Sequence, residues 1–146
     1  MHENGFNYLA DRVDDQLAYF DKSAAKNQKG YRFLKSTAIV CNILTTMTIA
    51  IAFTVPEDYK VWAGLVALVL SATVLATYQW EEFANYGAKW EKFRLVAERL
   101  KSEKWLYLTN SGHYSLDDHE VKHKLLVETV ENIIKRHGYI ILFAYG

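Results

Sequence analysis

The sequence has few of the residues that build disulfide frameworks or catalytic sites. Its 146 residues include one cysteine, Cys41, which excludes an internal disulfide and a cysteine-cluster metal site. The formal net charge is zero, so the chain lacks the basic surplus typical of nucleic-acid binding. It also has no glycine-rich phosphate loop, no nucleophile elbow and no paired carboxylates in an apolar setting. We therefore expect neither an enzyme nor a cofactor.

The most informative absence is that of charge in two long segments. Residues 36–55 and 61–80 contain no Asp, Glu, Lys, Arg or His. A helix of about 20 residues, at about 1.5 Å per residue, spans the roughly 30 Å of the hydrocarbon core. The Ile, Leu, Val and Phe residues of the first segment favour insertion by about 2–5 kcal/mol. The pattern predicts two transmembrane helices; a buried hairpin in a soluble helical protein is the alternative.

The segment between these runs, Pro56–Lys60 (PEDYK), is polar. Pro56 cannot continue a helical hydrogen-bond ladder, and so short a connection permits only an antiparallel return. Most Lys and Arg residues near the spans lie before the first and after the second, and the tip holds only Lys60. The positive-inside rule then places both termini in the cytoplasm of a multi-pass protein of the inner (plasma) membrane. Aromatic residues near the span ends indicate interfacial belts.

Amphipathic patterns flank both spans. Between residues 5 and 34, apolar residues recur in steps of three and four, as on one helix face. They are Phe6, Leu9, Val13, Leu17, Phe20 and Ala24. A heptad seam follows the second span. It comprises Phe83, Tyr86, Trp90, Phe93, Ala97 and Leu100. We expect the two patterns to pack together as cytoplasmic helices, or each to pack on another subunit.

A last helix is expected from Ser115 or Asp117, where Asp117 and Glu120 have capping-box spacing, to Gly138. The tail 139–145 is too short to span and would pack on the bundle or lie at the membrane surface. The expected fold is a single-domain, all-α membrane protein with a transmembrane hairpin and a cytoplasmic helical bundle. Its parts are a cytoplasmic helix (1–35), a first span (36–55), an external loop (56–60), a second span (61–80), and cytoplasmic helices with a tail (81–146).

Small and hydroxylated residues form a stripe within about 80° of the first span's circumference. They are Thr37, Cys41, Thr45, Thr48 and Ala52. Such a stripe is either a seam where helices approach closely or the lining of a wet pore. Asn42 and Thr46 lie further round the helix, and Gly64, Ala67 and Ser71 form a small-residue face on the second span.

Three other groups are candidates for function. Glu57 and Asp58 at the tip would form an acidic ring that favours cations if the chain oligomerises, or are simply polar loop residues. His119 and His123 have the four-residue spacing of two metal ligands, but no third ligand accompanies them and solvated histidines are the favoured interpretation. An ionic network between the cytoplasmic helices is the third. Its candidate members are Asp14, Asp15, Gln16, Arg94, Glu98 and Lys101.

Two blocks resemble the bacterial two-transmembrane SLATT superfamily (SMODS- and SLOG-associating effector domain), in particular its stand-alone members. The first block, residues 8–35, matches at Asp14, Asp15, Gln16, Tyr19, Lys22, Ala25, Asn27, Tyr31 and Arg32. The second, residues 85–108, matches at Trp90, Arg94, Ala97, Glu98, Leu100, Lys101, Glu103, Lys104 and Tyr107. The tail after Gly138 departs from the family's pattern. The resemblance implies a transmembrane hairpin that carries a cytoplasmic bundle, and a pore-forming effector of bacterial conflict systems, without catalytic residues.

Two functions fit these patterns. One is a homo-oligomeric membrane pore or ion channel, since two helices alone cannot enclose a conducting path. The other is a non-conducting, membrane-anchored scaffold whose heptad face binds a partner. Apart from the lipid bilayer and further copies of the chain, the sequence identifies no partner or trigger.

Overall fold

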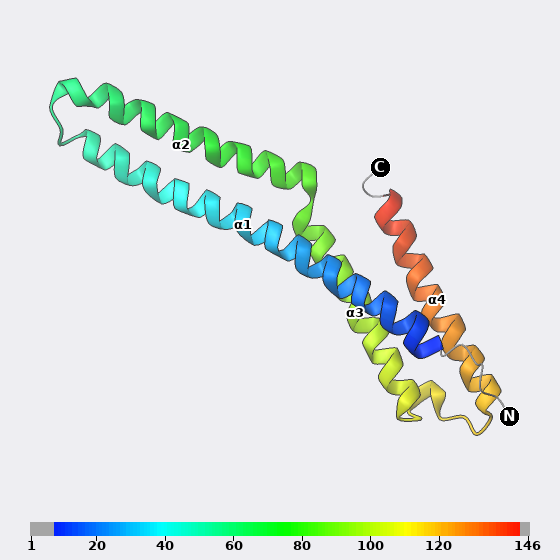
Figure 1. Cartoon of the computed structure of the whole chain (residues 1–146). Coiled ribbons are helices and arrows are strands. Elements are labelled where there is room, and N and C mark those ends of the chain that lie inside the picture. The colour runs from blue at the N-terminus through cyan, green and yellow to red at the C-terminus, as the bar shows by residue number, and fades with distance from the viewer. Residues whose placement is uncertain (1–7, 144–146) are drawn as a thin grey trace. The chain divides into compact units, whose positions relative to one another are not determined.

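The computed structural model describes residues 8–143, and the side chains of residues 8–136. This part of the chain is helical and contains no strand, which confirms the all-α class. The elements in order are η1 (Leu9–Val13, a π-helical turn), α1 (Asp14–Ala52), α2 (Glu57–Ala84), α3 (Tyr86–Leu108), η2 (Gly112–Tyr114, a 3₁₀ turn) and α4 (His119–Phe143) (Figure 1). They form two compact units: unit 1 comprises residues 1–26 and 88–146, and unit 2 comprises residues 27–87.

Unit 2 is a helical hairpin. Helix α1 continues without a break through position 36, so the expected amphipathic helix and the first apolar run belong to one helix. The part of α1 within unit 2 lies antiparallel to α2 (Figure 1). Ala38 of α1 and Val74 of α2 are buried, at 3% and 8% exposure. The two helices therefore pack along a narrow face and leave most of their surface uncovered.

The connection at the tip of the hairpin differs from the loop expected at residues 56–60. Helix α1 ends at Ala52, the connection comprises residues 53–56, and Pro56 is the N-cap of α2. Glu57 and Asp58 occupy the first turn of α2, where their carboxylates interact favourably with the positive end of the helix dipole. Lys60 Nζ lies 2.6 Å from Glu57 Oε1. Proline thus starts the second helix here, because its missing N–H costs nothing at a helix N-terminus.

The base of the hairpin contains a break that the heptad pattern does not show. Helix α2 ends at Ala84, and Asn85 adopts a left-handed conformation with φ of 52°. Its backbone N–H donates a 2.7 Å hydrogen bond to the Glu81 carbonyl. Phe83, an expected seam residue, precedes the break and is 82% exposed. The seam therefore begins only after Asn85.

The core of unit 1 is built from three helical segments. It takes residues from η1 and the start of α1, from α3, and from η2 and α4. The buried side chains are Tyr8, Val13, Phe20, Ala24, Phe93, Val96, Ala97, Leu100, Tyr114, Leu126 and Val130. The rings of Phe20 and Phe93 lie 6.1 Å apart between centroids. The two amphipathic patterns thus pack on each other within one chain; Phe6 lies outside the described residues.

Helix α4 differs from expectation at both ends. It begins at His119, and Asp118 rather than Asp117 is the cap, since its Oδ1 accepts the backbone N–H of Glu120 at 2.9 Å. It continues through Gly138 to Phe143, so the expected end at Gly138 is wrong. Val121, in the first turn of the helix, is 51% exposed. The side chains of residues 137–143, and residues 144–146 altogether, lie outside the described part, so the placement of the tail cannot be compared.

Candidate functional site

The outer surface of the hairpin is apolar. Large hydrophobic side chains on both helices are exposed, among them Ile43 (55%), Met47 (54%), Leu68 (65%) and Val69 (61%). Each of two helical stretches, within 9–52 and 57–114, contains an 18-residue segment apolar enough to cross a membrane. Only 6% and 11% of these segments is buried inside the chain. A core helix of a soluble protein would be mostly buried, whereas the apolar surface of these segments is left open to a membrane or to another apolar surface.

The threonine hydroxyl groups within the spans are satisfied by their own helices. The side chains of Thr45 and Thr48 donate to the carbonyls of Cys41 and Leu44, both at 2.8 Å. On α2, Thr73 donates to the Val69 carbonyl at 2.9 Å. Such local bonds allow threonine to face hydrocarbon, because no hydroxyl hydrogen is left without an acceptor.

The small-residue stripe of the first span lies on the partly covered side of α1. Thr37, Cys41, Thr45, Thr48 and Ala52 are all partly buried. Ala52 lines a shallow cavity together with Ala63, Gly64 and Ala67 of α2. This position favours the seam interpretation of the stripe, since small side chains allow two helices to approach closely.

Asn42 lies about 100° round α1 from Cys41, in the middle of the stripe, and is exposed. Its backbone carbonyl accepts the Thr46 hydroxyl at 3.0 Å, but its side-chain amide has no partner among the described residues. Asn42 is about 5 Å from the middle of residues 36–55 along the helix axis. Thr46 and Ala50 follow at four-residue intervals and are also exposed. The three residues form one ridge, which we call the Asn42 ridge.

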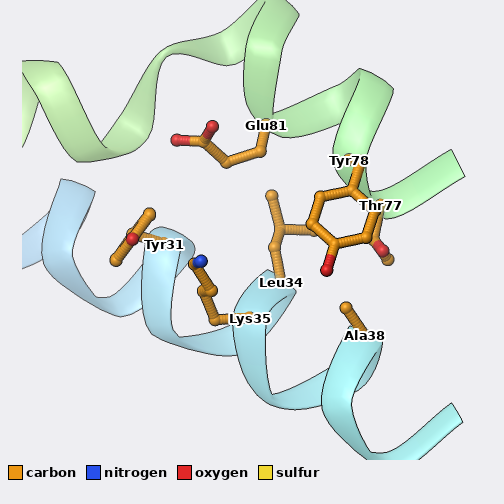
Figure 2. Close-up of a pocket in the computed structure, with 7 residues that line it drawn as sticks. All are labelled: Tyr31, Leu34, Lys35, Ala38, Thr77, Tyr78 and Glu81. Atoms are coloured by element: carbon orange, nitrogen blue, oxygen red, sulfur yellow. The ribbon is translucent and has the colours of Figure 1, made fainter. Parts of the chain in front are cut away.

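A cavity of about 120 Å³ lies at the base of the hairpin, between α1 and α2. Figure 2 shows the Lys35 ammonium and the Glu81 carboxylate projecting toward it from opposite helices, with aromatic rings at its sides. Its lining residues are Tyr31, Leu34, Lys35, Ala38, Thr77, Tyr78 and Glu81. We call this the base cavity. It combines one positive and one negative group with two tyrosines.

Two glycines next to this cavity allow close contacts with tyrosine rings. A Cβ at Gly30 would lie 3.2 Å from the ring of Tyr86, and one at Gly87 would lie 3.1 Å from the ring of Tyr31. The backbone N–H of Gly87 donates to Glu81 Oε1 at 3.1 Å. The left-handed turn after α2 is thereby packed and hydrogen-bonded, which fixes the position of the Glu81 carboxylate.

The ionic contacts of unit 1 involve partly different residues from the expected network. Lys101 Nζ lies 2.9 Å from Asp21 Oδ2 and 3.7 Å from Glu98 Oε1, and Arg94 pairs with Glu98 at 2.7 Å. Asp14 pairs with Lys104 at 2.5 Å. Asp21 lies seven residues after Asp14, on the same side of the helix. This spacing could have identified Asp21 as a member of the network from the sequence.

Asp15 and Gln16 lie off the line that joins Asp14 and Asp21. Asp15 is exposed, and Gln16 is partly buried. The structure therefore brings Arg94, Glu98 and Lys101 together. It places Asp15 and Gln16 on a different part of the α1 surface.

A second polar cluster, absent from the sequence-based expectations, joins the N-terminal segment to α4. Arg12 Nε and Nη2 donate to the two carboxylate oxygens of Glu131 at 3.0 and 3.3 Å, and the Tyr8 hydroxyl donates to Oε1 at 3.3 Å. The hydrogen bond from Arg12 lowers the pKa of Glu131. Burial, followed by the charge of Glu131, raises the pKa of Tyr8 to about 12.

The remaining site candidates are at exposed positions. Glu57 and Asp58 are exposed at the tip. His119 borders an open, polar depression, and the His123 ring packs edge-on against Tyr8 at 6.0 Å. Within the described residues, no group of three His, Cys, Asp or Glu side chains could hold a metal ion.

Comparison with known proteins gives one match. The model of a family described as protein of unknown function DUF4231 matches residues 15–122. No curated protein and no solved structure matches the chain. The match covers both helices of the hairpin and most of unit 1, so this chain belongs to the DUF4231 family.

Proposed function

We propose that this protein is a homo-oligomeric membrane pore or ion channel, with Asn42 on the face that lines its path. The observation that carries the proposal is an amide exposed near the middle of a span that contains no charged residue. A polar side chain at that depth is costly in lipid and in membrane proteins commonly faces a partner helix or water. In a single hairpin that served only as an anchor, this amide would face lipid.

Membrane insertion is supported by the uncovered apolar surface of the hairpin and by the locally bonded threonines. The distribution of Lys and Arg then supports cytoplasmic termini and an external tip in the plasma membrane. In this orientation Glu57 and Asp58 of each copy would gather at the outer mouth. A ring of carboxylates there would favour cations.

Oligomerisation follows from geometry. Helices α1 and α2 contact each other along one narrow face, so a single hairpin encloses no path. Several copies arranged with their Asn42 ridges toward a common axis would line a path with amides and hydroxyls, and the stripe from Thr37 to Ala52 would remain the seam with α2. This arrangement places the proposed lining about 100–180° round α1 from the centre of the stripe.

The scaffold alternative relied on a free heptad face. Phe93, Ala97 and Leu100 of that face are at most 8% exposed, because they pack within unit 1. The face is thus used inside the chain, which favours the pore. We also propose that the chain is a SLATT-type effector of a bacterial conflict or stress system, on the strength of the two sequence blocks.

The test is ion flux into liposomes that contain the purified protein, preceded by its mass in detergent. An oligomer with flux is expected. Asn42→Leu should reduce flux at least severalfold, whereas Thr45→Leu, a matched change on the seam, should act mainly on stability. A monomeric mass, or an oligomer without flux under any trigger tried, would contradict the proposal.

A further inference from the structure

The base cavity contains two opposite charges that are not paired with each other. The ammonium of Lys35 lies 5.8 Å from the centroid of the Tyr31 ring. Glu81 Oε1 accepts the Gly87 N–H, and Oε2 has no hydrogen-bond or ion-pair partner among the described residues. No ion pair joins Lys35 to Glu81 in that part of the chain. The cavity therefore offers one cation and one carboxylate oxygen to a ligand.

The position of the base cavity fits a lipid headgroup. Lys35 directly precedes the first charge-free run, and Glu81 directly follows the second. If the runs cross the hydrocarbon core, which is part of the proposed function, both side chains lie at the level of the headgroups. Tyr31 and Tyr78 then belong to the interfacial aromatic belt. Phospholipid headgroups are the polar groups present at the highest concentration at this depth.

The chemistry of the cavity matches a headgroup with both charges. A phosphate can pair with Lys35, and a primary ammonium can donate to Glu81 Oε2 while it lies beside the tyrosine rings. The volume of about 120 Å³ corresponds to about four water molecules at roughly 30 Å³ each, which suits an aminoethyl group. A quaternary ammonium has no N–H to donate, and a glycerol headgroup carries no positive charge.

We propose that the base cavity binds the headgroup of a phospholipid with a primary ammonium, such as phosphatidylethanolamine. Glu81 recognises the ammonium, Lys35 the phosphate, and the Gly87 N–H holds the carboxylate in position. This inference rests on the membrane insertion of the proposed function and adds a specific lipid to it. Because the cavity joins α1 to α2 at the base of the hairpin, an occupied site would stabilise the contact between them.

The test is native mass spectrometry of the full chain after reconstitution in equal amounts of phosphatidylethanolamine, phosphatidylcholine and phosphatidylglycerol. We expect retained phosphatidylethanolamine to exceed each of the others about tenfold, as one charge-assisted hydrogen bond predicts. Glu81→Gln should abolish this preference, since its amide oxygen still accepts the Gly87 N–H but carries no charge. Glu82→Gln is the matched control, because Glu82 is exposed and does not line the cavity.

Lys35→Gln should lower retention of phosphatidylethanolamine, and Arg32→Gln should not, because Arg32 does not line the cavity. Equal retention of the three lipids, an unchanged preference in Glu81→Gln, or equally tight binding of soluble phosphoethanolamine would overturn the proposal. A protein that inserts and conducts but shows no preference refutes the lipid site alone. A protein that fails to insert refutes the proposed function instead.

Discussion

The ring of Tyr86 packs directly on Gly30, so that a Cβ at position 30 would lie 3.2 Å from its Cδ1 atom. Gly30 lies within the long helix α1, where glycine normally costs about 1 kcal/mol relative to alanine. The close approach explains its presence. Residues separated by the whole hairpin are held together at this point, next to the left-handed turn at Asn85.

Replacement of Gly30 by leucine should therefore destabilise the hairpin base. A larger side chain must displace the Tyr86 ring, and overpacking of this kind costs about 1–3 kcal/mol. Thermal unfolding in detergent, followed by circular dichroism, would measure the change. Lys29→Leu adds the same side chain at an exposed neighbour and is expected to alter stability little. Equal effects of the two variants would show that the ring contact is unimportant.

The Arg12–Glu131 pair should make stability depend on pH in the acid range. Since Arg12 lowers the pKa of Glu131, the folded state favours the carboxylate. The stabilisation is present above the unfolded pKa of Glu131 and is lost as the pH falls through the lower, folded pKa. Glu131→Gln should flatten this acid limb in a series of unfolding curves. Glu128→Gln, at an exposed position of α4, should leave it unchanged.

Tyr8 should make the stability of the protein fall at alkaline pH, separately from the effect of Glu131 in the acid range. Burial raises its pKa from 10.0 to about 12, so the folded state favours the neutral phenol. Its contribution is complete below the unfolded pKa and is lost as the pH rises from about 10 to about 12. Tyr8→Phe should reduce this alkaline limb and leave the part that comes from Tyr114, whose pKa burial also raises. Tyr19→Phe should not reduce it, because Tyr19 is 57% exposed. A limb of unchanged size in Tyr8→Phe would contradict the assignment to Tyr8.

Two adjacent aspartates, Asp117 and Asp118, precede α4, and of the two it is Asp118 that caps the helix. Asp118 accepts the backbone N–H groups of Glu120 and Val121, at 2.9 and 3.4 Å. Asp118→Ala should cost about 1 kcal/mol of stability, the usual effect of removing a cap. Asp117→Ala should have a much smaller effect, although Asp117 has the better sequence spacing to Glu120. The reverse order of the two variants would restore the sequence-based assignment.

Periodicity and charge patterns anticipated the elements but not the junctions between them. The apolar steps of Val13, Phe20 and Ala24, and of Phe93, Ala97 and Leu100, predicted which faces are buried, because burial on a helix follows its period. The break at Asn85 was not predicted, since asparagine at a left-handed position leaves no periodic signal. The position of the tip differs from the expected loop because proline ends one helix and can also begin the next, and here Pro56 is the N-cap of α2.

The candidate site was predicted less well than the fold. A stripe of hydroxyls identifies one side of a helix, but whether that side meets the second helix or the surroundings depends on packing. Here the stripe is partly covered and Asn42 is not. The base cavity combines Lys35 and Glu81, which lie on different helices, and no local motif connects such residues.

The most direct test of the central claim is the ionic current across a planar lipid bilayer that contains the purified oligomer. We predict discrete conductance steps, a severalfold smaller conductance for Asn42→Leu, and cation preference that weakens when Glu57 and Asp58 are both changed to their amides. A membrane that stays electrically silent with a verified, inserted oligomer would contradict the account.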